Sequence, residues 1–134
     1  MTGLRLENII ASYGALSILD DLNLTVDQGD IVVLLGPSGS GKSTLLRLIA
    51  GLHFPESGNI FWNSQNLNNV PTHLRGMGMV FQDYALFHHR NVFENIEFGL
   101  KMAKIPKDQR NEQVHELLDL FNLKEFSSRN IDSL

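Results

Sequence analysis

The chain has 134 residues, of which 43% are apolar and 19% charged, a length for one packed domain and a composition that excludes collagen-like, low-complexity and disordered chains. The absence of cysteine excludes disulfides and thiolate chemistry, and a net charge of -4 argues against nucleic acid, because surfaces that bind a phosphate backbone are basic. No apolar run approaches the roughly 18 residues of a membrane helix, so we expect the chain to be cytoplasmic.

The first half of the chain predicts strands followed by a helix. Apolar and polar residues alternate over 4–6 and over 22–26, the pattern of half-buried strands. Residues 31–35 read Ile-Val-Val-Leu-Leu, which predicts a strand buried on both faces, as in a parallel sheet. Apolar residues then recur at helical spacing over 45–49, and Gly51 is placed to end that helix as a left-handed cap.

The second half predicts two more strands and a pair of helices. The strands are expected at 59–62 and at 77–81. Asn91 followed by Glu94 three residues later is typical of a capping box at the start of a helix. A second amphipathic helix is predicted from the apolar spacing over 114–121.

Residues 36–43 read Gly-Pro-Ser-Gly-Ser-Gly-Lys-Ser, the phosphate-loop pattern G-x-x-x-x-G-K-[ST], between a predicted strand and a predicted helix. The alternative, a glycine- and serine-rich turn without a ligand, does not explain these flanking elements. Glycines let backbone N–H groups turn toward a triphosphate, and the start of the helix adds its positive end. Lys42 would reach the β- and γ-phosphates, and the Ser43 hydroxyl would bind Mg²⁺. The candidate nucleotide-binding residues of this segment are Gly36, Ser38, Gly39, Ser40, Gly41, Lys42, Ser43 and Thr44.

Together with Tyr13 upstream and Gln82 downstream, these segments resemble the ATP-binding cassette (ABC) family, the nucleotide-binding subunits of membrane transporters. The resemblance covers nearly the whole chain. It implies that Tyr13 stacks on the adenine of ATP and that Gln82 reaches Mg²⁺ and the attacking water. Lys42 and Gln82 are then the candidate catalytic residues, and Ser43 and Gln82 the candidate ligands of Mg²⁺. The matching segments are 12–14, 36–44, 48–51, 75–83 and 95–100.

The resemblance implies an α/β fold, a P-loop NTPase core with N-terminal antiparallel β strands and the start of a helical subdomain. Residues 1–134 would form the N-terminal part of one ATPase domain, with the nucleotide-binding core at 1–87 and the helical subdomain beginning at 88–134. The family's signature, acidic strand and switch histidine have no counterpart in the sequence. We therefore expect a truncated domain that binds ATP without turning it over.

For the intact family member, the resemblance implies an ABC-type ATPase that couples ATP binding and hydrolysis to solute import. The implied partners are transmembrane permease subunits, a second copy of the ATP-binding subunit and, indirectly, a solute-binding protein, with no nucleic acid. The chain would then lie on the cytoplasmic face of the cell membrane. Within the family, residues 81–100 most resemble the corresponding segment of importers of inorganic ions such as iron(III), of polyamines or of sugars.

Other functions stay open at the level of sequence. A soluble P-loop kinase would need an arginine-rich lid that the sequence does not suggest. A non-transport ABC ATPase and a catalytically dead docking fragment are the remaining alternatives. Residues 84–87 fit either a core segment or the family's contact with the membrane subunit. His88 and His89 are expected on the surface, because adjacent histidines lack the spacing of metal ligands.

Overall fold

The computed structural model describes residues 2–14 and 16–133, including their side chains except those of Thr2 and Tyr13. The chain divides into two units, Met1–Met79 and Val80–Leu134. Among the described residues, no helix is both long enough and apolar enough to cross a membrane.

The first unit contains an antiparallel sheet of four strands in the order β2-β1-β3-β4. The alternating apolar residues set the register: Leu6 of β1 lies opposite Leu24 of β2 on one side and Ile60 of β3 on the other. The strands predicted at 4–6, 22–26 and 59–62 are thereby confirmed. The strands are β1 (Thr2–Tyr13), β2 (Leu16–Asp27), β3 (Ser57–Trp62) and β4 (Gln65–Asn66).

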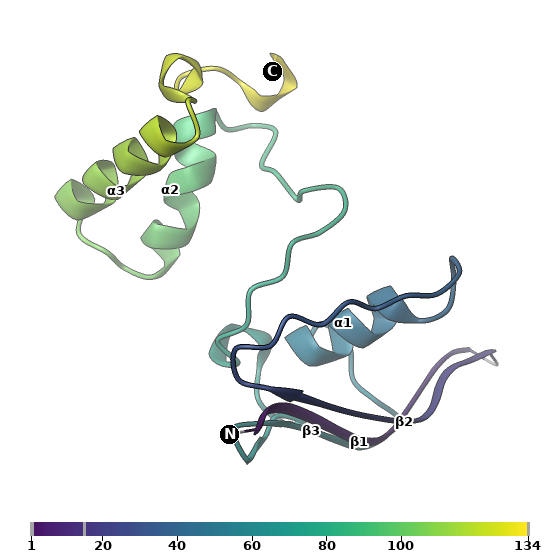
Figure 1. Ribbon diagram of the computed structural model, residues 1–134. Helices are drawn as coiled ribbons and strands as arrows, with labels where there is room; N and C mark the ends of the chain where they lie inside the picture. Colours follow the sequence, from purple (N-terminus) through teal and green to yellow (C-terminus); the bar gives the residue numbers. More distant parts are fainter. Residues whose placement is uncertain (1, 15, 134) are drawn as a thin grey trace. The chain divides into compact units, whose positions relative to one another are not determined.

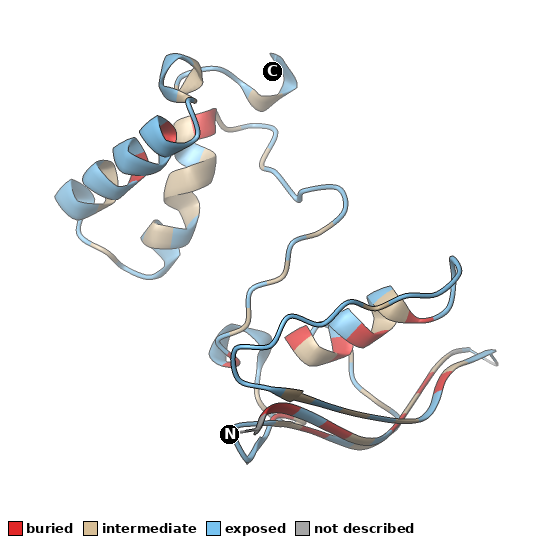
Figure 2. Ribbon diagram, in the orientation of Figure 1, coloured by how far each residue is buried: buried red, intermediate tan, exposed pale blue. Residues whose placement is uncertain are grey.

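Helix α1 (Lys42–Ala50) covers one face of this sheet (Figure 1). Leu48 of α1 is fully buried in one cluster with Leu6, Ile9 and Ile60 of the sheet, so the helix and the strands share a core. Buried residues accordingly lie on both α1 and the strands (Figure 2). Gly51 ends α1 with a φ of 79°, which confirms the predicted left-handed cap.

The strands predicted at 31–35 and 77–81 are wrong. Both segments have no regular secondary structure, and Ile31 and Val80 are 94% and 89% exposed. An apolar run indicates a tendency to be buried, but a strand of a parallel sheet also needs hydrogen-bonded neighbours and covering helices. The sheet formed by the described residues is entirely antiparallel and includes neither segment.

The second unit contains α2 (Val92–Met102) and α3 (Lys107–Leu120), which pack through Val92, Val114 and Leu118. Both predicted helices are therefore confirmed. Three short 3-10 helices complete the described elements, η1 in the first unit and the others in the second: η1 (Thr72–Leu74), η2 (Lys124–Phe126) and η3 (Ile131–Ser133).

The buried stripe of α3 is narrower than the apolar pattern of the sequence. Leu117 and Phe121 share that pattern with Val114 and Leu118, yet they are 39% and 65% exposed. Within the second unit, α2 is the helix that packs along α3, and one neighbour buries only one narrow face of a helix.

The capping box at the start of α2 is confirmed, and its loss should destabilise the second unit. The Asn91 side chain accepts a hydrogen bond from the Glu94 backbone N–H at 2.8 Å, and the Glu94 carboxylate accepts one from the Asn91 N–H at 3.0 Å. We expect Asn91→Ala to lower the free energy of unfolding by about 1 kcal/mol, measured by urea denaturation. Lys101→Ala, at an exposed position of the same helix, is the control. Equal midpoints for both variants would contradict this prediction.

Candidate functional site

The loop over residues 36–41 reaches α1 through glycines with left-handed backbones. Gly39 has a φ of 82° and Gly41 a φ of 86°, a conformation that side chains rarely allow. At Gly41 space is also short, because a Cβ atom there would lie 2.8 Å from Ile18 Cγ2 and 2.9 Å from Leu19 Cδ2. Glycine at position 41 therefore lets the start of α1 press directly against β2.

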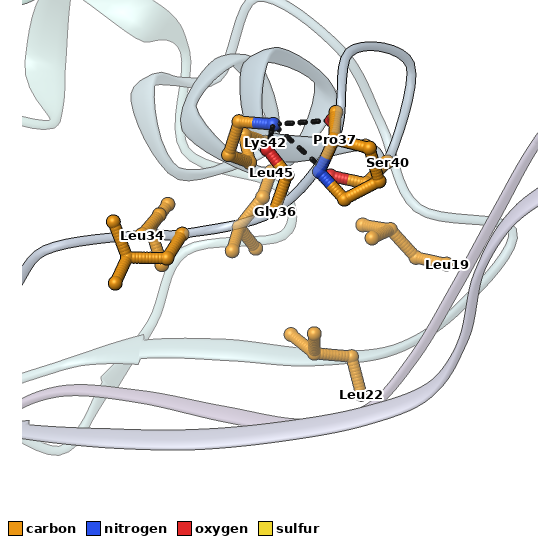
Figure 3. A pocket seen from close by; sticks show the side chains of 10 residues that line it. Leu19, Leu22, Leu34, Gly36, Pro37, Ser40, Lys42 and Leu45 are labelled. Atoms are coloured by element: carbon orange, nitrogen blue, oxygen red, sulfur yellow. Dashed lines mark hydrogen bonds between the residues drawn. The ribbon is translucent and has the colours of Figure 1, made fainter.

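The Lys42 ammonium group lies over the loop and holds it in its curved form (Figure 3). Its Nζ donates hydrogen bonds to the carbonyl oxygens of Gly36 at 2.8 Å and Pro37 at 2.7 Å, and to Ser40 Oγ at 3.1 Å. All three acceptors are neutral, and within the described part of the chain no carboxylate pairs with Lys42. Its positive charge is thus available to an anion at the loop.

The first turn of α1 adds to this positive character. It contains no acidic residue, and no side chain of the described residues caps its N-terminus. The first N–H groups of a helix have no partner within the helix, and they carry the positive end of its dipole. Ser43 is exposed and Thr44 is half-buried on this turn, so two hydroxyls lie beside the free N–H groups. Loop, lysine and helix terminus together form a candidate anion site.

A cavity of about 300 Å³ borders the loop. Five leucines line it, along with the loop residues 36–37 and 40–42 (Figure 3). An apolar wall does not suit a triphosphate. We therefore expect the anion on the outward side of the loop, where residues 36–40 are exposed. The leucines are Leu19, Leu22, Leu34, Leu35 and Leu45.

The structure brings together the predicted site residues of the loop and first turn, 36–44. Gln82 is exposed and belongs to the second unit. The side chain of Tyr13 lies outside the described part of the chain. Among residues 2–14 and 16–133, no three His, Asp or Glu side chains gather to hold a metal ion. The Ser43 hydroxyl and the Gln82 amide oxygen are both exposed, and each is an oxygen donor of the kind that Mg²⁺ takes.

Sequence reasoning missed two residues at the other end of α1. The guanidinium group of Arg75, only 5% exposed, donates hydrogen bonds to the carbonyl oxygens of Leu48 and Ile49, and the Thr72 hydroxyl donates one to Gly51. Burial lowers the pKa of the Arg75 guanidinium below its ordinary value. The sequence signals only that the last carbonyls of α1 need donors, and nothing local indicates that residues more than 20 positions away supply them.

Comparison with known proteins agrees with this geometry. Residues 19–134 match the family model described as "ABC transporter". The chain belongs to the ABC transporter family. This confirms the family resemblance drawn from the phosphate loop and its companion segments.

Two curated relatives in this family carry the same name, "Spermidine/putrescine import ATP-binding protein PotA". The one from Clostridium acetobutylicum is 44% identical over 131 residues, which is 98% of this chain and 37% of the relative. The one from Haemophilus influenzae is 44% identical over 126 residues, which is 94% of this chain and 34% of the relative. The chain thus spans about a third of the length of these ABC relatives.

The fold agrees with a solved structure of the family. The chain is similar to the ATP-binding cassette MJ0796, solved as a dimer in a post-hydrolysis state bound to ADP and Pi, with a TM-score of 0.83 and 26% sequence identity. The similarity covers 98% of this chain and 62% of that chain. The predicted fold class, an α/β ABC ATPase fold with antiparallel N-terminal strands and the start of a helical subdomain, is confirmed.

Proposed function

We propose that this chain is part of the ATP-binding subunit of an ABC importer and that residues 36–44 bind the phosphates of ATP. The observation that carries the proposal is the position of Lys42. Its ammonium group lies over a loop of exposed backbone, at the start of a helix with no acid in its first turn. The names of the two relatives, both ATP-binding proteins of polyamine import, support the same function.

On ATP binding, Lys42 would exchange its contacts with the Gly36 and Pro37 carbonyls for oxygens of the β- and γ-phosphates. The exchange needs little reorganisation, because the ammonium group is already held at the loop. The backbone N–H groups of the loop and of the first turn would bind the remaining phosphate oxygens. The Tyr13 ring would stack on the adenine.

In hydrolysis, water attacks the γ-phosphorus, the bond to the β–γ bridging oxygen breaks, and ADP leaves, while the oxygen and the protons of the water stay with the released phosphate. Lys42 and the loop N–H groups would stabilise the negative charge that moves onto the bridging and γ-oxygens. Gln82 would orient the water through its side-chain amide. Ser43 and Gln82 are the residues that would hold Mg²⁺, whose chemistry when bound is to supply further positive charge at the phosphates.

We propose transmembrane permease subunits, a second copy of this subunit and, indirectly, a solute-binding protein as partners, at the cytoplasmic face of the membrane. Tyr84 and Leu86 are 75% and 42% exposed, which favours an interface over a core role for residues 84–87. Phe87 is half-buried against Phe98, with ring centroids 4.4 Å apart, and it anchors this segment on α2. We propose polyamines as the transported solutes, by analogy with the two relatives.

The test of the proposed site compares ATP with AMP by equilibrium dialysis in the presence of Mg²⁺. The loop binds phosphates rather than the base, and AMP lacks both the β- and the γ-phosphate. We therefore expect ATP to bind at least about 100-fold more tightly than AMP, the factor that two charge-assisted hydrogen bonds would supply. Equal affinities would mean that the anion site is not used and would contradict the proposal.

A further inference from the structure

The carbonyl end of α1 is enclosed by two side chains of the segment that follows the sheet. The Thr72 hydroxyl donates a hydrogen bond to the Gly51 carbonyl at 2.6 Å. Arg75 Nη1 donates to the carbonyls of Leu48 at 2.9 Å and Ile49 at 3.0 Å. We call Thr72 and Arg75 the α1 clasp. Together they donate to three carbonyl groups at the end of α1, where the last carbonyls lack the usual helical partners; the Leu48 carbonyl also accepts from the Gly51 N–H.

The charge of Arg75 is compensated in an unusual way. The side chain is buried, and within the described residues no carboxylate pairs with it. Its acceptors are main-chain carbonyls, those of Leu48 and Ile49 and, through Nε at 2.9 Å, that of Val70. The negative end of the α1 dipole therefore takes the place of an acidic partner. Such an arrangement depends on the exact position of the end of the helix, because a displaced helix would leave a buried charge unpaired.

Gly51 fixes the path of the arginine across the end of the helix. A Cβ atom at position 51 would lie 2.5 Å from Arg75 Nε and 2.7 Å from Cζ. The left-handed cap of α1 and the guanidinium group thus occupy complementary space. The segment 72–75 and the end of α1 are consequently held in a single arrangement.

The two ends of α1 contact different parts of the structure. Lys42 and the phosphate loop lie at its first residue, and the clasp lies at its last, so the position of one end determines the position of the other along a short rigid helix. We propose that Arg75 and Thr72 are positioning residues for the phosphate loop: they fix the carbonyl end of α1 and so hold Lys42 in the geometry that binds ATP. This inference rests on the proposed function of the loop.

The clasp and the ATP site should be coupled in both directions. If the clasp favours the loop geometry that binds ATP, then binding of ATP must favour the closed clasp by the same free energy. The backbone N–H groups of Gly51 and Leu52 donate to the carbonyls of Leu48 and Arg47, at 3.1 and 2.9 Å, and they report on closure of this end. Their hydrogen exchange should slow when Mg-ATP binds, although they belong to the opposite end of the helix.

The experiment measures the Kd of Mg-ATP by equilibrium dialysis for the chain and its variants. We expect Arg75→Met to weaken binding at least about tenfold, the effect of losing one to two hydrogen bonds from a charged group. Arg75→Lys should fall between Arg75→Met and the unchanged chain, because an ammonium group keeps the charge but cannot span three carbonyls. Arg47→Met, an exposed arginine in the last turn of the same helix, is the matched control and should stay within twofold.

A second variant and a second readout distinguish a loss of positioning from a loss of folding. Thr72→Val keeps the shape of the side chain and removes one hydrogen bond, so the chain should fold and bind ATP up to about tenfold more weakly. In the unchanged chain, Mg-ATP should slow hydrogen exchange at Gly51 and Leu52 several-fold. In the Thr72→Val variant the slowing should be smaller.

The outcomes separate this inference from the proposed function. Failure of the unchanged chain to bind Mg-ATP would overturn the proposed function and this inference together. Normal binding by the unchanged chain, by Arg75→Lys and by Thr72→Val would overturn the inference alone. Slowing at Gly51 and Leu52 in the ATP-saturated chain that is no larger than the slowing at the amides of β1 would also overturn it. Any ligand of the folded state slows exchange through global unfolding, whereas closure of the clasp adds protection at its own end of α1.

Discussion

Replacing Lys42 by alanine should abolish measurable binding of Mg-ATP. The change removes a charged group that lies over the loop, with its Nζ at 2.7–3.1 Å from three loop oxygens. Hydrogen bonds to a charged group contribute about 1.5–3 kcal/mol each. Loss of two such bonds to phosphate oxygens would weaken binding by at least about 100-fold. Equilibrium dialysis with labelled ATP measures this directly.

Two controls separate loss of the charge from loss of the loop. Lys101→Ala removes an exposed lysine from α2 and should bind Mg-ATP like the unchanged chain. Lys42→Met retains most of the length of the side chain without the ammonium group, and it should bind as poorly as Lys42→Ala. An unchanged affinity of Lys42→Ala for Mg-ATP would contradict the assignment of this loop as the nucleotide site.

Replacing Gly41 by alanine should damage both stability and nucleotide binding. Alanine at a φ of 86° is strained by about 1–2 kcal/mol, and its Cβ would also press on Ile18 and Leu19 of β2. Relief of that overlap requires β2 and the start of α1 to move apart, which adds about 1–3 kcal/mol. We expect a total loss of about 2–5 kcal/mol in the free energy of unfolding, measured by urea denaturation.

Gly39→Ala is the matched comparison for Gly41→Ala. Its φ of 82° is nearly the same, but apart from its chain neighbours no described residue has an atom within 4 Å of the Cβ that the change would add. The difference between the two variants therefore isolates the contact of the loop with β2. Equal losses of stability would indicate that β2 yields without cost, and that backbone strain alone explains the need for glycine at both positions.

The elements that the sequence predicts correctly are those with local signals. Asn91 and Glu94 are three residues apart and cap their own helix, and Gly51 ends α1 through its own backbone conformation. The strand predicted at 31–35 is wrong because the apolar residues of this segment do not indicate which strands would pair with it. Strand pairing depends on distant parts of the chain, and sequence patterning reports on it only indirectly.

The same distinction applies to the candidate site. Residues 36–44 are contiguous, so their motif predicts their grouping without knowledge of the fold. The contacts of Lys42 with the Gly36 and Pro37 carbonyls could not be foreseen, since they depend on how the loop curves. The contacts of Arg75 with α1 have no local signal, because its partners there are 26 and 27 residues away.

The pairing order of the sheet also constrains the path by which the chain folds. Strand β1 pairs on one side with β2, its neighbour in sequence, and on the other with β3, where Leu6 and Ile60 are partners more than 50 residues apart. The first pairing joins strands that are adjacent in sequence. The second can form only after residues 28–56, which include α1, have folded back so that β3 reaches β1. Because distant pairings cost more chain entropy, the β1–β3 ladder should set the folding rate of the first unit. The hairpin of β1 and β2 would then form first, and α1 would pack onto it afterwards.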